Sequence, residues 1–296
     1  MRRVSVFLVV MTLIAGVVGC DGPSAGVQIQ DWYDLDGIRD NLDGQFTLMN
    51  ELDSTTDGYT ELASPTANGG KGWLPIGIWP NPFVGSFDGQ GFEISDLFID
   101  REGEDDVGLF SFVDTGGIIV GVALIDATVI GKVYVSGLVG HNHDGSLRNC
   151  HSAGNVAGDA QVGGLVGINE GTVSNSYSTA AVTGGETVGG LVGWNGGTVS
   201  NSYSTGGVTG NSSVGGLVGN DNGVATNSFW DTETSGKTSS AGGIGKTTAE
   251  MQDIDTFMGA TWDIVAVANP GTRNTSYIWN IVDDTTYPFL SWEPVS

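Results

Sequence analysis

The stretch "VGGLVGWNGGTVSNSYSTGGVTG", residues 188–210, decides the fold because close copies of it stand on both sides. Upstream the chain has "VGGLVGINEGTVSNSYSTAAVTG", residues 162–184, and downstream it has "VGGLVGNDNGVATNSFWDT", residues 214–232. The quoted stretch holds no charged side chain and is rich in glycine, serine and threonine. Self-similarity at a fixed period indicates a repeat architecture, so the period is the first quantity to establish.

Two sets of markers give the same period. A Gly-Leu pair recurs with spacings of 29, 27, 26 and 26 residues, and an Asn-x-His/Tyr/Phe marker follows it in steps of 26. The repeat positions that we identify are Gly137, Leu138, Gly164, Leu165, Gly190, Leu191, Gly216, Leu217, Asn149, Asn175, Asn201, Asn227, Tyr177 and Tyr203. The first unit, near Gly108, is more apolar, and the last one decays after Trp230, as expected for the ends of an array.

Each unit contains three short segments with the composition of β-strands, separated by Gly- and Asn-rich bends. Three strands and three bends in 26 residues describe one coil of a solenoid, in which residues 26 apart stack at roughly 4.8 Å. The sequence therefore predicts an all-β fold, a parallel β-helix or β-solenoid with short capping helices at its ends. A two-sheet sandwich remains the alternative. Within "TVSNSYS" we expect Ser200, Ser202 and Ser204 to point inward and Val199, Asn201 and Tyr203 to point outward.

The repeated words resemble the GLUG motif, a repeat of exported bacterial and archaeal proteins that occurs in adhesin-like chains and beside some IgA-peptidase-type domains. The resemblance covers residues 105–230. The segment "LPIGIWPNPFVGSFDGQGFEISDLFI", residues 74–99, is similar to the lead-in of such repeats, and "FWDTETSGKTSSAGGIGKTTAEM", residues 229–251, is similar to their trailing segment. The resemblance implies a β-solenoid and an exported location. It implies no particular ligand, and the zinc-peptidase pattern His-Glu-x-x-His is absent from the sequence.

The flanks of the array predict short helices. Leu35, Ile38 and Leu42 share one side of a short helix before the array, and Thr247 with Glu250 forms a capping-box pattern after it. The expected organisation is a lipoprotein-type signal peptide at 1–19, a linker at 20–30, an N-terminal cap with irregular first coils at 31–104, the GLUG array at 105–230 and a C-terminal capping segment at 231–296.

The first twenty residues have the features of an export signal. Arg2 and Arg3 precede a mainly apolar run of fifteen residues, Val4 to Val18, which is too short for a membrane span of about 20 residues. "VVGC", residues 17–20, resembles the lipobox of bacterial lipoproteins, which makes Cys20 the expected site of lipid attachment. An ordinary secretory signal is the alternative. We expect an exported protein at the cell surface, held to the membrane through this lipid.

The charge excludes one class of partner. The chain carries 34 acidic and 10 basic residues, a formal net charge of −24, so it repels nucleic acid. Such acidity suits a solvated exterior, a calcium-rich environment or a salty one. Four acidic residues are interpreted as a solvated turn, with calcium binding across their carboxylates as the alternative: Glu102, Glu104, Asp105 and Asp106. No cofactor is otherwise expected.

No catalytic group is evident in the repeats. The acidic residues of the coils do not recur at one coil position, and Cys150 takes the place of Ser176 and Ser202, which indicates a small packed residue. We interpret "HNHD", residues 141–144, as a surface turn, because its equivalents in sister repeats are not histidines.

The sequence therefore predicts a non-catalytic surface protein with an adhesive or scaffolding role toward an extracellular protein or glycan. A carbohydrate-binding or carbohydrate-cleaving β-helix and a passive spacer are the alternatives.

Overall fold

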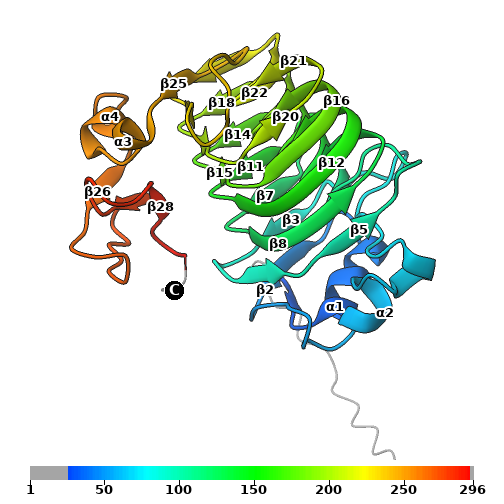
Figure 1. Ribbon diagram of the computed structural model, residues 1–296. Helices are drawn as coiled ribbons and strands as arrows, with labels where there is room; N and C mark the ends of the chain where they lie inside the picture. The colour runs from blue at the N-terminus through cyan, green and yellow to red at the C-terminus, as the bar shows by residue number, and fades with distance from the viewer. Residues whose placement is uncertain (1–25, 294–296) are drawn as a thin grey trace, which may run out of the picture.

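The computed structural model describes residues 26–293 and forms a parallel β-solenoid (Figure 1). Strands one repeat apart lie side by side in register: Thr198 pairs with Thr172 on one side and with Val224 on the other. The strands within the coils pair in parallel, whereas a sandwich of the immunoglobulin type is antiparallel. The predicted solenoid with 26-residue coils is therefore confirmed. The predicted signal peptide, including Cys20, lies outside the described residues.

Three parallel sheets wrap the solenoid, and a small fourth sheet lies in the C-terminal segment. The eight-stranded sheet contains β1 (Val27–Ile29), β2 (Gln45–Leu48), β3 (Ser86–Asp88), β7 (Ile118–Val120), β11 (Ser146–Arg148), β14 (Thr172–Ser174), β18 (Thr198–Ser200) and β23 (Val224–Thr226). The five-stranded sheet contains β6 (Phe110–Val113), β10 (Val139–Asn142), β13 (Val166–Asn169), β17 (Val192–Asn195) and β22 (Val218–Asp221). The twelve-stranded sheet contains β4 (Glu93–Ser95), β5 (Phe98–Asp100), β8 (Ala123–Ile130), β9 (Val133–Ser136), β12 (His151–Gly163), β15 (Tyr177–Ser178), β16 (Ala181–Gly189), β19 (Tyr203–Ser204), β20 (Val208–Thr209), β21 (Ser212–Gly215), β24 (Phe229–Asp231) and β25 (Ile244–Lys246). The fourth sheet contains β26 (Ile264–Ala266), β27 (Trp279–Ile281) and β28 (Phe289–Leu290).

Short helices flank the array, as the sequence predicts. The N-terminal ones are α1 (Trp32–Asp36), η1 (Gly37–Asp40), α2 (Tyr59–Leu62) and η2 (Ala67–Gly70), and the C-terminal ones are α3 (Thr248–Met251) and α4 (Ile254–Met258). The capping box forms at α3, where Thr247 accepts from the Glu250 amide and the Glu250 side chain bonds back to the amide of Thr247. Leu35 and Ile38 are fully buried and join the solenoid core, whereas Leu42 lies beyond the end of η1 and packs partly buried against that core.

The corner asparagines change which side chains point inward. Asn201 adopts the left-handed conformation, with φ of 48°, and so breaks the strand alternation. Val199 before the corner and Ser202 and Ser204 after it are all fully buried. The prediction is therefore correct for the latter two serines and wrong for Val199, which packs in the core, and for Ser200, which is partly exposed.

A serine ladder runs through the same corner of each coil. The Oγ of Ser176 accepts a hydrogen bond from the Cys150 amide at 3.0 Å, and Ser202 accepts from the Ser176 amide at 3.1 Å. The pattern continues with Ser228, which accepts from the Ser202 amide. Cys150 is a buried free cysteine at the start of this ladder, in agreement with its interpretation as a small packed residue.

A buried asparagine ladder corrects the interpretation of residues 141–144 as a surface turn for their first half, whereas His143 and Asp144 do form an exposed bend. His141 lies on strand β10, and Asn142 is fully buried. The Asn142 side-chain amide donates to Asn169 Oδ1 at 2.7 Å, and that of Asn169 donates to Asn195 Oδ1 at 2.7 Å. Asn195 in turn donates to Asp221 Oδ1 at 2.8 Å, so equivalent amides satisfy one another along the interior.

The C-terminal segment packs against the flank of the solenoid (Figure 1). Tyr177 and Tyr203 stack with ring centroids 4.8 Å apart, and both side chains point away from the solenoid core. They are buried instead in a second apolar cluster, which contains Trp262 and Trp279 of this segment. Residues 235–241 follow the edge of the last coil, where the Ser240 hydroxyl accepts hydrogen bonds from backbone amides.

Candidate functional site

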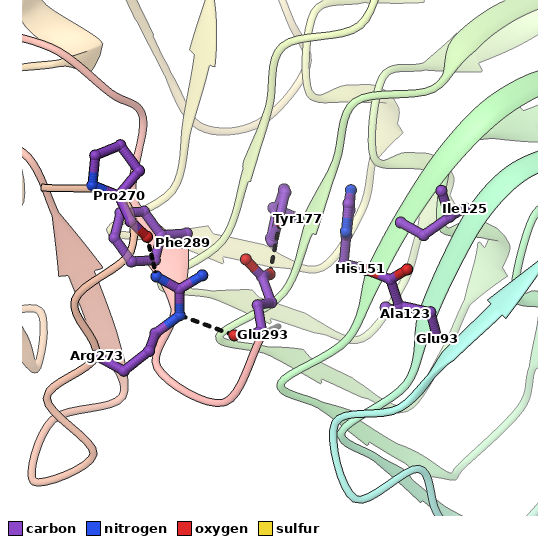
Figure 2. A pocket seen from close by; sticks show the side chains of 9 residues that line it. All are labelled: Glu93, Ala123, Ile125, His151, Tyr177, Pro270, Arg273, Phe289 and Glu293. Carbon is purple, nitrogen blue, oxygen red and sulfur yellow. Dashed lines mark hydrogen bonds between the residues drawn. The ribbon is translucent and has the colours of Figure 1, made fainter. Parts of the chain in front are cut away.

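A pocket with a cavity volume of about 210 Å³ lies between the solenoid and the C-terminal segment (Figure 2). The solenoid contributes strands β4, β8, β12 and β15, and the C-terminal segment contributes residues 270–293. The lining residues are Glu93, Ala123, Ile125, His151, Tyr177, Pro270, Arg273, Phe289 and Glu293. Two carboxylates, one from each part of the chain, therefore face one cavity.

The register of the twelve-stranded sheet explains the solenoid wall of this pocket. Tyr203, Tyr177 and His151 occupy one column, and their rings stack nearly in parallel, with interplanar angles of 9° and 11°. The next position of the column is Ala123, and Glu93 follows it. The aromatic column thus ends at His151, and beyond it one coil contributes only a methyl group.

Hydrogen bonds hold the C-terminal wall against this column. The Tyr177 hydroxyl donates to Glu293 Oε1 at 2.6 Å, and the Tyr203 hydroxyl donates to the carbonyl oxygen of Pro288. Arg273 donates from Nε to the carbonyl oxygen of Glu293 at 2.8 Å, and its guanidinium lies 4.5 Å from the centre of the Phe289 ring.

Burial favours the neutral forms of the ionisable groups in the pocket. It raises the pKa of Glu293 to about 7, although the hydrogen bond from Tyr177 works in the opposite direction. It also raises the pKa of Glu93, together with the charges of Glu51 and Asp126. Burial lowers the pKa of His151 to about 3, so its ring is uncharged at neutral pH.

A second surface of interest is the outer row, which we define as Phe112, His141, Ile168 and Trp194 on the five-stranded sheet. The register places these residues on successive coils. Phe112 is covered by Trp79, which is 64% exposed. The remaining three side chains of the row are partly exposed.

Contacts with neighbouring residues hold two side chains of the outer row, Trp194 and His141, in position. An added Cβ at Gly196 would overlap the six-membered ring of Trp194, so this ring packs directly against the glycine. His141 Nε2 lies 3.0 Å from Glu170 Oε2, and Nδ1 lies 3.5 Å from Asp106 Oδ1. Burial opposes protonation of His141, but hydrogen bonds to these two carboxylates outweigh it and raise its pKa.

The proposed calcium residues do not converge. Glu104 forms ion pairs with Lys71 at 2.8 Å and with Arg101 at 3.0 Å, which lower its pKa against the effect of burial. Asp106 turns toward His141. Within residues 26–293, no three His, Cys, Asp or Glu side chains gather in an arrangement that could hold a metal ion.

The predicted repeat residues occupy structural positions. Leu138, Leu165, Leu191 and Leu217 are fully buried in the core. The corner asparagines Asn149, Asn175, Asn201 and Asn227 all have φ between 47° and 55°. Glycine is required at 137, 164, 190 and 216, where an added Cβ would overlap a neighbouring coil or an inward side chain.

Sequence reasoning missed the pocket. Glu93 and Glu293 are separated by most of the chain, and no local pattern connects them. The aromatic column was detectable from the 26-residue period for Tyr177 and Tyr203, which were identified as repeat residues. The C-terminal partner of that column was not detectable.

The fold and these surfaces define the class of protein: a parallel β-solenoid whose coils are sequence repeats. Residues 158–183 and 184–209 match the family model of the GLUG motif. The chain therefore carries two GLUG-motif repeats within its solenoid, as the resemblance implied.

Two relatives match part of the chain. The chain is 39% identical over 146 residues to halomucin of Haloquadratum walsbyi, across 47% of this chain and 2% of halomucin. It is 34% identical over 119 residues to a glycine-rich candidate membrane protein of Evansella cellulosilytica, across 39% of this chain and 13% of that protein. The chain thus spans only a small part of either relative.

A solved structure shares the fold. The crystal structure of a candidate immunoglobulin A1 protease from Bacteroides ovatus matches 92% of this chain and 94% of its own, with a TM-score of 0.56 and 18% identity. At this identity the likeness shows the fold alone.

Proposed function

We propose that the protein is a non-catalytic, exported repeat protein of the cell surface that mediates adhesion or surface scaffolding. The observation that carries this proposal is the outer row, in which His141, Ile168 and Trp194 stand in register on a rigid sheet. Partly exposed aromatic side chains held in fixed positions are typical of recognition surfaces. The similarity to segments of halomucin and of a candidate membrane protein supports a surface or membrane-associated location.

The proposal includes a lipid anchor at Cys20. The apolar segment and the "VVGC" sequence support it. Among residues 26–293, no helix has the length and apolar character to cross a membrane. Mass spectrometry of the N-terminal peptide from membrane fractions tests the anchor. Diacylglyceryl-modified Cys20 is expected, and an unmodified peptide beginning elsewhere contradicts it.

Adhesion is tested by deleting the gene and restoring it with full-length variants. We expect deletion to reduce attachment of cells to a glycan- or protein-coated surface and the wild-type chain to restore it. Trp194→Ala combined with Trp79→Ala removes the aromatic surface and is expected to fail to restore attachment. The matched control is Tyr277→Ala, at a partly exposed aromatic residue away from the outer row.

The outcomes separate the functions. Loss of attachment only with the outer-row variant supports adhesion through this surface. Full attachment after deletion contradicts adhesion and favours a passive spacer. Release of reducing ends or unsaturated products from a polysaccharide panel contradicts the non-catalytic assignment and favours a carbohydrate-cleaving β-helix.

A further inference from the structure

The pocket of Figure 2 has the features of a ligand site, although it lies away from the outer row. It is formed where an ordered aromatic column stops. His151 stacks on Tyr177 with ring centroids 3.9 Å apart, so one face of the imidazole is occupied. On its other side the column continues with Ala123, whose methyl group leaves no ring to cover that face.

The walls supply polar groups that converge on the same space. Glu93 follows Ala123 in the column, and Glu293 approaches from the C-terminal segment. Each carboxyl group can accept hydrogen bonds from sugar hydroxyl groups whether it is ionised or protonated, because its carbonyl oxygen is an acceptor in both forms. Tyr177 already donates to Glu293, which fixes the position of that carboxylate.

The chemistry of these walls selects the class of ligand. A flat ring face is suited to stacking on an uncharged imidazole, while two carboxylates on the rim favour a ligand with several hydrogen-bond donors. The cavity volume of about 210 Å³ accommodates one six-membered ring with its substituents. Arg273 also lines the pocket, but its guanidinium bonds to the Glu293 carbonyl oxygen and lies over Phe289, and the net charge of −24 disfavours anionic ligands.

We propose that this pocket binds a single pyranose unit of a neutral glycan, with the C–H face of the sugar against His151 and its hydroxyl groups donating to Glu93 and Glu293. The inference deepens the proposed surface function by naming a ligand class, and it therefore rests on that function for its biological setting. Its physical basis is independent of the outer row.

Binding is measured on the full chain by saturation-transfer NMR and titration. The probes are methyl glycosides of glucose, galactose and mannose and the methyl glycosides of their N-acetylated amino sugars. We expect at least one to bind with a Kd in the millimolar range. Glu93→Gln retains the shape of the side chain but removes a charge, and it is expected to weaken binding about tenfold.

Two further variants locate the site. Ala123→Phe fills the open position in the column and is expected to abolish binding, with folding checked by circular dichroism and thermal unfolding. Val224→Ala changes an exposed side chain on the eight-stranded sheet, outside both the pocket lining and the outer row, and is expected to leave binding unchanged. If Ala123→Phe does not fold, Glu93→Gln alone carries the test.

Three results would overturn the inference. No probe binds at about 10 mM, roughly ten times the expected Kd; binding is unchanged in Glu93→Gln; or binding is lost in Val224→Ala. Benzyl alcohol is a second probe, and binding of it without binding of any glycoside overturns the sugar assignment. Failure here leaves the attachment assay unaffected, because that assay depends on Trp79 and Trp194.

Discussion

Replacing Asn169 by alanine is expected to destabilise the solenoid strongly, although the residue belongs neither to the pocket lining nor to the outer row. Its Oδ1 accepts from Asn142 at 2.7 Å, and its Nδ2 donates to Asn195 at 2.7 Å. All three residues have 0% exposure. Alanine therefore leaves one donor and one acceptor buried without their strongest partner, at a cost of about 1–3 kcal/mol each.

The expected loss in the free energy of unfolding is about 2–4 kcal/mol. It lies in the lower part of the range that the two costs add up to, because Asn142 retains a longer hydrogen bond to the Gly145 carbonyl oxygen at 3.3 Å. Denaturation by guanidinium chloride, followed by far-ultraviolet circular dichroism, measures the free energy of unfolding. The matched control is Asn211→Ala at an exposed position, which is expected to change stability by no more than about 0.5 kcal/mol. Equal effects of Asn169→Ala and Asn211→Ala would refute the reasoning.

Three further predictions concern packing and ionisation. Gly164→Ala is expected to lower the free energy of unfolding by about 2 kcal/mol or more, because the added Cβ overlaps neighbouring atoms. The control Gly207→Ala places its Cβ in open space and is expected to change the free energy of unfolding by less than about 0.5 kcal/mol. Guanidinium denaturation measures both variants. Cys150 is expected to resist alkylation in the folded chain, since burial raises its pKa to about 12; rapid modification under native conditions contradicts this. Glu293 has a folded pKa of about 7 against an ordinary 4.5, so the stability that it adds is fully present below about pH 4.5 and is lost as pH rises to about 7. The stability difference between wild type and Glu293→Gln should therefore fall over this window by at most about 3 kcal/mol, and a difference that is flat or rises contradicts the buried carboxyl.

The period was sufficient to predict the solenoid because like residues stack on like in a parallel β-helix. Steps of 26 residues place Tyr177 and Tyr203 in one column. The same steps show that Cys150 occupies the position of the corner serines in the next coils. These features need only the register between neighbouring coils, which the repeat itself specifies.

Which side chains point inward was harder to predict from the sequence. Asn-Gly sequences are typical of turns, so Asn195 suggested a surface bend, yet a fully buried amide is stable there because Asn169 and Asp221 satisfy it. The left-handed corner at Asn201 likewise shifts the strand alternation by one residue, and a simple period of two does not reveal this.

The candidate pocket depends on contacts between distant segments. Ala123 is an unremarkable residue in sequence, and its importance arises only because His151 lies one coil away and Glu293 approaches from the C-terminal segment. The docking of that segment on the tyrosine column is set by tertiary packing, for which the sequence offers aromatic content but no partner.

The central claim, that residues 26 apart stack on adjacent coils, is tested most directly by disulfide trapping. Thr172, Thr198 and Val224 are exposed neighbours in one column. With Cys150 replaced by serine and the chain begun at residue 26, cysteines at 172 and 198 lie about 4.8 Å apart, within the range that a disulfide spans. Cysteines at 172 and 224 lie about twice as far apart, beyond that range. Mass spectrometry after mild oxidation should show nearly complete linkage of the first pair and little of the second, and equal or reversed linkage would contradict the 26-residue coil.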